Sequence, residues 1–181
     1  AYSNRMCGIN GLITADSDLK RKIQEANDLI KHRGPDDEGY VFINTSSSAV
    51  NQFSGKDSPE EIRKKFPLLA FNVNSSEEVI LAHRRLSIID LSANGHCPMT
   101  DPGGNIWLTY NGEIYNYIEL REELKTAGYR FRTTSDTEVI INSYLHWGTE
   151  CLNKFNGMWA FAIWDNRKKR LLLARDRFGV K

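Results

Sequence analysis

Apolar runs that predict β-strands lie near both ends of the chain, and predicted hairpins outnumber strand–helix–strand units. The first run is Cys7–Thr14, and the last two, 158–165 and 170–175, are joined by the polar segment Asn166–Lys169. Alternating hairpins and helices pack antiparallel sheets against helices more readily than they build a doubly wound parallel sheet. We therefore expect an α+β fold.

Three segments have the apolar spacing of amphipathic helices. The first spans residues 19–30 and must end before Gly34-Pro35, because that pair cannot continue a helix. The second is 117–127. The third, 135–147, opens with Ser-Asp-Thr-Glu, which matches a capping box.

Short strands are predicted between these helices, at residues 39–44, 79–82, 86–89 and 106–110. Residues 45–76 are the least regular part of the chain, and we interpret them as a surface excursion that includes a short helix at 59–65. Asn111-Gly112 follows the last of these strands. Taken alone, this dipeptide is most simply a hairpin turn.

The composition is that of an ordinary globular protein. Its 181 residues are 40% hydrophobic and 26% charged, with a formal net charge of +1, which does not favour a nucleic-acid partner. No apolar stretch approaches the roughly 18 residues of a membrane span, and no secretory h-region is present, so we expect a cytoplasmic protein without a membrane partner.

The cysteines and histidines lack the spacing of a disulfide framework or a metal site. Cys7, Cys97 and Cys151 are odd in number and contain no CxxC pair, which favours reduced thiols. None of the four histidines has a ligand-like spacing, so no metal is expected. His96-Cys97 suggests a Cys–His pair, but adjacent residues rarely serve one another as nucleophile and base.

Seven short motifs occur in order along the chain and together resemble the class II glutamine amidotransferase domain of asparagine synthetase-like proteins. They are Cys7-Gly-Ile-Asn-Gly11, His32-Arg-Gly-Pro-Asp-Asp-Glu-Gly39, His83-Arg-Arg-Leu-Ser-Ile-Ile-Asp90, Asn111-Gly-Glu-Ile-Tyr-Asn116, Ser135-Asp-Thr-Glu138, Gly157-Met-Trp-Ala-Phe-Ala162 and Arg175-Asp-Arg-Phe-Gly179. Each motif is weak alone. Seven motifs in the same order leave little room for a chance resemblance.

This resemblance implies a four-layer α/β/β/α sandwich of the N-terminal nucleophile hydrolase type. It also implies that residues 7–181 form the glutaminase domain and that residues 1–6 are a leader or vector residues. A C-terminal synthetase domain is expected to be absent from this chain. The sequence contains no Ser-Gly-Gly-x-Asp-Ser pyrophosphate loop, so we expect no cofactor here and assign ATP and Mg to the missing domain.

Cys7 is the candidate nucleophile. A cysteine at a free amino terminus can use its own α-amino group, whose pKa is ordinarily about 7.7–8.0, as the base that takes the thiol proton. The resemblance implies hydrolysis of L-glutamine to glutamate and ammonia through a thioester on Cys7. Without the other motifs, a buried structural cysteine would be the simpler interpretation.

The resemblance also assigns roles to other residues. Asn111 and Gly112 would form the oxyanion hole, and Arg85 would bind the substrate carboxylate through its planar fork. Arg84 is interpreted as a solvated or structural charge. The remaining predicted substrate-binding positions are the backbone around Leu86, Ile88 and Ile89, and the ammonium ligands Glu113 and Asp136.

Several alternatives stay open at this stage. Asp136 is also explained as a first-turn acid that interacts with a helix dipole. The segment from His32 to Asp36 shapes a pocket wall or a mobile loop, or it is structural. The ammonia acceptor is aspartate or a related carboxylate, and a homodimer stays open. If residues 1–6 remain attached, the nitrogen of Cys7 is an amide, and the chain would be a silent glutamine-binding or interaction module.

Overall fold

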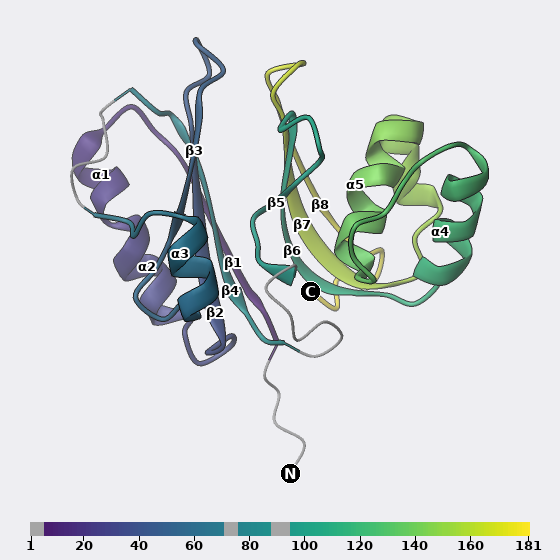
Figure 1. The fold of residues 1–181 in the computed structure, drawn as a ribbon, viewed down its shortest axis with the longest axis horizontal. Coiled ribbons are helices and arrows are strands. Elements are labelled where there is room, and N and C mark those ends of the chain that lie inside the picture. The colour runs from purple at the N-terminus through teal and green to yellow at the C-terminus, as the bar shows by residue number, and fades with distance from the viewer. Residues whose placement is uncertain (1–5, 71–75, 88–94) are drawn as a thin grey trace. The chain divides into compact units, whose positions relative to one another are not determined.

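A computed structural model describes residues 6–70, 76–87 and 95–181. The chain divides into two compact units, Ala1–Pro98 and Met99–Lys181. Each unit carries one four-stranded antiparallel sheet with helices on one of its faces (Figure 1).

The sheet of the first unit has the strand order β1-β4-β2-β3. Its strands are β1 (Gly8–Ile13), β2 (Asp37–Ile43), β3 (Val50–Ser54) and β4 (Val79–Arg85). The central strands β2 and β4 are buried along their whole length. In the β1–β4 pair, Gly8 lies opposite Arg84, so the residue after Cys7 is fixed beside the end of β4.

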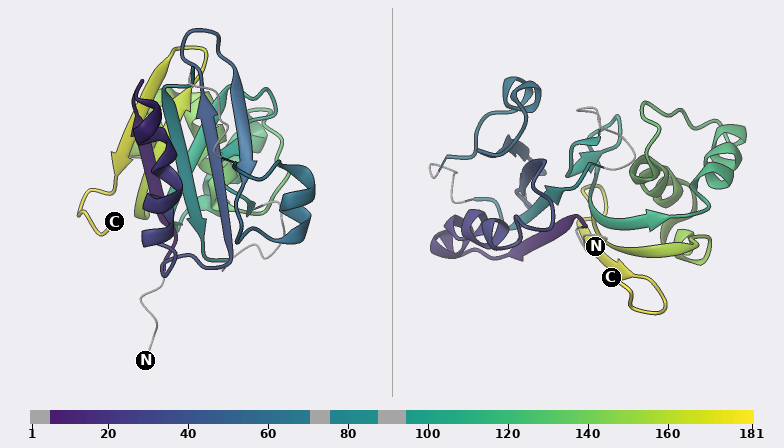
Figure 2. Two further views of the ribbon diagram at one scale, coloured as in Figure 1. Left: turned by 90° about the vertical axis from the view of Figure 1, so that its left-hand side faces the viewer. Right: turned by 90° about the horizontal axis from the view of Figure 1, so that it is seen from below.

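Three short helices accompany this sheet: α1 (Ser17–Arg21), α2 (Ile23–Leu29) and α3 (Glu60–Lys65). The carboxylate of Asp16 caps α1 by accepting the N–H of Asp18 at 2.8 Å. Helix α2 packs against β1 and β4, and Figure 2 (left) shows α1 and α2 lying across the sheet. The helix predicted at 19–30 is thus two helices, because at Lys22 the N–H donates to Leu19, one residue short of α-helical spacing.

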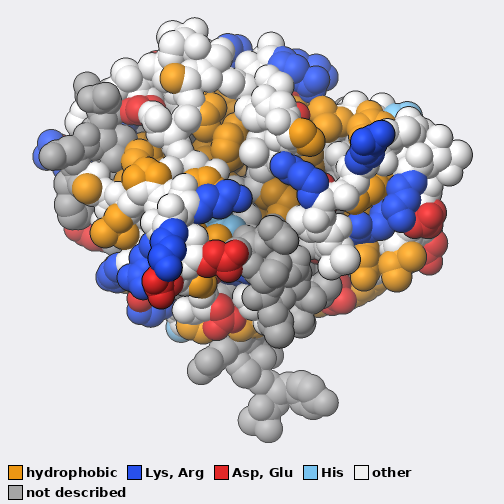
Figure 3. Space-filling model, viewed as in Figure 1, with side chains coloured by type: hydrophobic (Ala, Val, Ile, Leu, Met, Phe, Trp, Pro, Cys, Tyr) orange, Lys and Arg blue, Asp and Glu red, His pale blue; other side chains and the backbone are white. Residues whose placement is uncertain are grey.

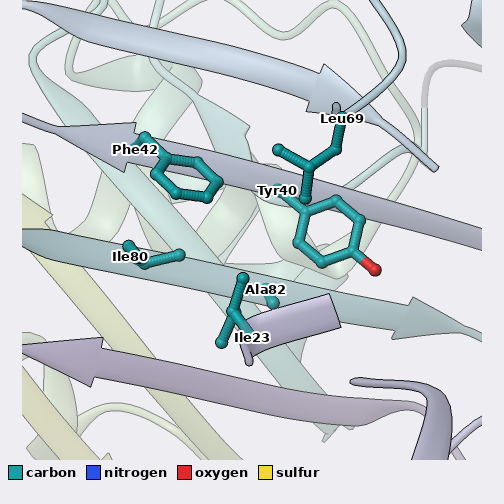
Figure 4. Close-up of a cluster of buried hydrophobic side chains, with 6 residues drawn as sticks. All are labelled: Ile23, Tyr40, Phe42, Leu69, Ile80 and Ala82. Atoms are coloured by element: carbon teal, nitrogen blue, oxygen red, sulfur yellow. The ribbon is translucent and has the colours of Figure 1, made fainter. Parts of the chain in front are cut away.

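A cluster of buried side chains joins the helices to the first sheet (Figure 4). It consists of Ile23, Tyr40, Phe42, Leu69, Ile80 and Ala82, all at most 7% exposed. The side chains from β2 and β4 occupy alternate positions, as expected for one face of a sheet. Burial of this face holds the register that places Arg84 and Arg85 at the end of β4.

The sheet of the second unit has the order β5-β6-β7-β8. Its strands are β5 (Met99–Thr100), β6 (Ile106–Ile114), β7 (Gly157–Asp165) and β8 (Arg170–Arg175). Helix α4 (Tyr117–Thr126) packs on α5 (Asp136–Trp147), which packs on β5 and β6 and is followed by the 3-10 helix η2 (Gly148–Asn153). The hairpin predicted at 158–165 and 170–175 and both predicted helices of this unit are confirmed.

Two predictions about local structure are wrong. The region 45–76 contains, besides the predicted short helix, the strand β3, which pairs with β2 and packs Phe53 edge-on against Phe42 at 5.5 Å between ring centroids. The capping box does not form, because the carboxylate of Glu138 accepts the backbone N–H groups of Arg132 and Thr133 instead of that of Ser135.

The face of the molecule in Figure 3 carries both positively and negatively charged side chains. Figure 3 shows Lys and Arg side chains beside Asp and Glu side chains on this face, without an extended area of one sign. Within the described residues, every helix is too short or too polar to cross a lipid bilayer.

Candidate active site

Of the predicted site residues of the first unit, Cys7, Arg85 and Leu86 lie where β1 begins and β4 ends. Cys7 is partly buried, and its Sγ accepts the backbone N–H of Leu86 at 3.3 Å. The same sulfur lies 3.7 Å from the carbonyl oxygen of Leu86. The N–H directed at sulfur favours a thiolate, which a nucleophile requires, whereas the carbonyl oxygen that accepts from the thiol favours the protonated form.

A loop at residues 33–36 braces this junction, a role that the sequence did not reveal. Nε of Arg33 donates to the carbonyl oxygen of Cys7 at 3.3 Å. The carboxylate of Asp36 accepts the N–H of Ser87 at 2.9 Å, and its own N–H donates to the carbonyl of Arg85 at 3.1 Å. The loop therefore contacts the backbone on both sides of the Cys7–Leu86 contact.

Arg85 ends β4 opposite Asp37 of β2. Its side chain is buried, with 8% of the residue exposed, and the guanidinium lies so close to Gly95 that a Cβ there would be 2.0 Å from a guanidinium nitrogen. Any side chain at position 95 would therefore displace the predicted carboxylate ligand. The other two predicted positions on this segment, Ile88 and Ile89, lie outside the described residues.

Next to Arg85 lies a buried histidine–carboxylate pair. Nδ1 of His96 is 2.7 Å from Oδ2 of Asp37, and the ring stacks on Phe66. Burial lowers the pKa of His83 on the adjacent β4 to about 3, although the charge of Asp37 opposes this shift. The contacts of His96 with Asp37 and Phe66 give no support to a pair with Cys97.

In the second unit, Asn111 and Gly112 lie inside β6, paired with Ala160 and Trp159 of β7. The alternative of a simple Asn-Gly hairpin turn is therefore wrong. At Gly112 the backbone of β7 comes so close to β6 that a Cβ would lie 2.3 Å from the carbonyl oxygen of Met158. Only glycine allows the two strands this close.

The side chain of Asn111 is buried without full hydrogen bonding by the fold. Its Oδ1 has no partner among the described residues, and the residue is 8% exposed. A buried polar atom left unpaired costs about 1–3 kcal/mol. The unpaired atom is an acceptor, so it could accept a donor from a ligand, but it is not the N–H that an oxyanion requires.

Asp136, the first residue of α5, is held against β6. Its Oδ2 accepts the hydroxyl of Tyr110 at 2.7 Å and the N–H of Ile114 at 3.0 Å. Burial raises the pKa of Asp136, while these hydrogen bonds oppose the rise. The neighbouring Glu113 is exposed. Tyr110 was missed in the sequence, although it lies two residues before Gly112 on the same face of a strand.

The interpretation of Arg84 is partly corrected, because its side chain has no exposed surface and is not solvated. Within the described part of the chain, one group of three side chains has the spacing of a metal site, namely Asp28, Glu38 and Asp57. The guanidinium of Arg84 already lies among these carboxylates.

These features define a domain with a strand-end thiol, a buried arginine beside it and an asparagine–glycine pair inside a second antiparallel sheet. A family model described as "Glutamine amidotransferase domain" matches residues 70–181, more than half of the chain. The chain therefore belongs to the glutamine amidotransferase domain family. This confirms the predicted family and the class of enzyme to which the domain is assigned.

Similar proteins carry related names. "Asparagine synthetase [glutamine-hydrolyzing] 1" of Bacillus subtilis is 38% identical over 181 residues, covering 97% of this chain and 23% of the relative. "Asparagine synthetase [glutamine-hydrolyzing] 3" of the same organism is 34% identical, with 97% and 24% covered. The chain thus spans about a quarter of the length of these curated relatives.

A solved structure supports the fold. Glutamine phosphoribosylpyrophosphate amidotransferase from B. subtilis has a TM-score of 0.67 at 20% identity, with 97% of this chain and 38% of that chain covered. The likeness supports the predicted α+β class with antiparallel sheets.

Proposed function

We propose that residues 7–181 form a glutaminase domain that hydrolyses L-glutamine to glutamate and ammonia. The observation that carries the proposal is the contact of the Cys7 thiol with the backbone N–H of Leu86, at 3.3 Å. Membership of the glutamine amidotransferase domain family supports the same reaction.

The first step forms a bond between sulfur and carbon. In a chain that begins at Cys7, the free α-amino group takes the thiol proton, and the thiolate attacks the side-chain carboxamide carbon of glutamine. The carbonyl electron pair moves to oxygen. We assign the side-chain N–H of Asn111 and the backbone N–H of Gly112 as the donors to that oxyanion, where losing one donor ordinarily costs about 2.7–4 kcal/mol.

The second step breaks the carbon–nitrogen bond. The protonated amine of Cys7 returns its proton to the departing nitrogen, which leaves as ammonia, and a thioester remains on Cys7. Water then attacks the thioester carbon, with its proton taken by the same amine. Glutamate is released and the thiol is restored.

Substrate recognition requires one group for each charge of the free amino acid. Arg85 would bind the α-carboxylate through its fork, and Asp136 together with Glu113 would bind the α-ammonium. The backbone around Leu86, Ile88 and Ile89 would line the pocket. Arg85 and Asp136 are both buried, where solvent and salt screen an interaction with a charged substrate group less than at the surface.

The ammonia is proposed to pass to an ATP-dependent synthetase domain in a longer protein. The relatives' names and their roughly fourfold greater length support this coupling. ATP and Mg would bind there, with none needed for hydrolysis in residues 7–181, and the acceptor would be aspartate or a related carboxylate. The free thiols of Cys7, Cys97 and Cys151 support a cytoplasmic location.

A silent glutamine-binding or interaction module is the alternative. It is favoured wherever Met6 stays bonded to Cys7, because the nitrogen of Cys7 is then an amide and cannot act as a base.

Ammonia release from glutamine tests the proposal. A chain that begins at Cys7 should be active, the chain that retains residues 1–6 should be at background, and Cys7→Ala in the trimmed chain should be folded and inactive. Cys151→Ala is the matched control and should keep activity, because Cys151 is fully buried in η2. Trimmed wild-type protein that binds glutamine without releasing ammonia would favour the silent module.

A further inference from the structure

Arg84 is the largest fully buried side chain in the described residues. An arginine without exposed surface is costly unless every part of its guanidinium is paired. It immediately precedes Arg85, the proposed carboxylate ligand, and it lies opposite Gly8, the residue after Cys7.

All three guanidinium nitrogens of Arg84 have partners. Nη1 donates to Oδ2 of Asp57 at 2.8 Å, and Nε donates to the carbonyl oxygen of Asn27 at 3.1 Å. Nη2 pairs with Oε2 of Glu38 at 3.1 Å and with the carboxylate of Asp28. These partners come from α2, from β2 and from the segment between β3 and α3. A single side chain therefore ties three elements to the end of β4.

The carboxylates are themselves fixed. Lys31 and Lys56 pair with Asp57 and Asp28 from outside, each at 2.8 Å, so three acidic groups face three basic ones. Glu38 also accepts the N–H of Asp57 at 2.8 Å. Burial alone would raise the pKa of Asp57, but the hydrogen bonds from Lys31 and Arg84 outweigh it and lower that pKa.

Arg84 pairs with Gly8 of β1, and its carbonyl group lies against Gly34 of the loop at residues 33–36. A Cβ on Gly8 would lie 3.5 Å from Cβ of Arg84, and a Cβ on Gly34 would lie 2.4 Å from its carbonyl oxygen. Two residues further on, the N–H of Leu86 reaches Sγ of Cys7. A small movement of Arg84 would therefore move the thiol contact and the Arg85 fork together.

We propose that Arg84 is a positioning residue. Its ion-pair cluster with Asp28, Glu38 and Asp57 holds the end of β4 so that Leu86 stays on the Cys7 thiol and Arg85 stays directed at the substrate carboxylate. This inference rests on the proposed glutaminase function. A cluster that only stabilises the fold would change the melting temperature and leave the thiol and the glutamine KM unaffected.

Arg84→Lys tests the inference in the trimmed chain. Lysine keeps the charge, but its single nitrogen cannot reach all four partners at once. We expect the glutamine KM to rise about 10-fold, with a smaller change in kcat. The rate of Cys7 alkylation by iodoacetamide, read by mass at that residue, should change at least threefold.

Two controls separate positioning from stability. Ile80→Ala removes a fully buried side chain at the other end of the same strand, so it should lower the melting temperature without changing the KM or the alkylation rate. Lys56→Met removes a largely exposed cation of the cluster and leaves all Arg84 contacts in place, so the KM should stay within twofold.

The inference is overturned if Arg84→Lys melts lower yet matches Ile80→Ala in KM and alkylation rate. If Arg84→Lys does not fold, Glu38→Gln, which keeps the shape of the cluster, must show the same two changes or the inference fails. The rate of Cys7 alkylation can be measured without enzymatic turnover. Trimmed wild-type protein that releases no ammonia would therefore overturn the proposed glutaminase function but not the proposed role of Arg84. The changed alkylation rate still decides whether Arg84 positions Cys7.

Discussion

The hydroxyl of Tyr110 donates a hydrogen bond of 2.7 Å to Oδ2 of Asp136, which connects strand β6 to the first residue of α5. This bond favours the ionised carboxylate, whose pKa is raised by burial. A carboxylate that binds the substrate ammonium must be ionised. Glutamine binding should therefore weaken as the pH falls, beginning at a higher pH than for an ordinary aspartate.

Tyr110→Phe should worsen this loss. Without the donor, the protonated form of Asp136 is favoured further, so we expect the glutamine KM to rise roughly threefold to tenfold at pH 5 and less than twofold at pH 8. Tyr144→Phe is the matched control, because Tyr144 pairs with Asp165 at 3.2 Å from the same helix. Equal pH profiles for the two variants would remove Asp136 from ammonium binding.

Gly112→Ala should disrupt the proposed oxyanion hole. Its Cβ would lie 2.3 Å from the carbonyl oxygen of Met158 and 2.5 Å from Cα of Trp159, so β6 or β7 must shift. We expect ammonia release to fall at least about 100-fold, the scale of losing one oxyanion donor.

Gly11→Ala controls for the same chemical change within a strand. Its Cβ would meet the carbonyl oxygen of Ile80 at an ordinary 3.5 Å, so activity should stay within about twofold. Equal losses in the two variants would mean that Gly112 has no special role.

The elements that the sequence predicted best are those whose local signals agree with their tertiary environment. The β7–β8 hairpin has an apolar run on each side of a polar turn, and α5 has an apolar face that packs on β6. Strand β3 could not be predicted in the same way. Its residues are largely polar, and its hairpin pairing with β2 across residues 44–49 leaves no periodic apolar signal in the sequence.

The sequence motifs predicted individual residues of the candidate site but not the contacts that hold them in place. Motifs indicated Cys7 and Arg85, but the contacts of Arg33 and Asp36 with this region depend on how a loop returns to the strand end. The burial of Arg84 depends on three acidic residues that are far apart in the sequence. The residues next to Arg84 in the sequence give no indication of these three partners, so the burial of its side chain could not be predicted.

Arg85→Lys should weaken glutamine binding. A point charge replaces a planar fork, so we expect the KM to rise about 10-fold with a smaller effect on kcat, measured by steady-state ammonia release. Arg63→Lys, on the exposed face of α3, should leave the KM unchanged. An unchanged KM in Arg85→Lys would exclude Arg85 from carboxylate binding.

His83 should make the stability of the first unit sensitive to acid. It is 2% exposed, and burial is the main cause of its pKa of about 3. In the unfolded chain its pKa is about 6.5. Between these two values the unfolded chain binds one more proton than the folded one, so stability is full above pH 6.5 and is lost as the pH falls, by up to about 1.4 kcal/mol per pH unit.

His83→Gln removes this proton uptake. Urea unfolding between pH 4.5 and 7 should show a free energy of unfolding that is lower at pH 7, because a buried group has been replaced, but that falls less steeply with acid by about 1 kcal/mol per pH unit. His32→Gln, at an exposed histidine, is the matched control and should keep the wild-type slope. If His83→Gln and the wild-type protein lose stability at the same rate, His83 takes up its proton in the folded state, and the burial of a neutral imidazole between β1 and β2 would have to be abandoned.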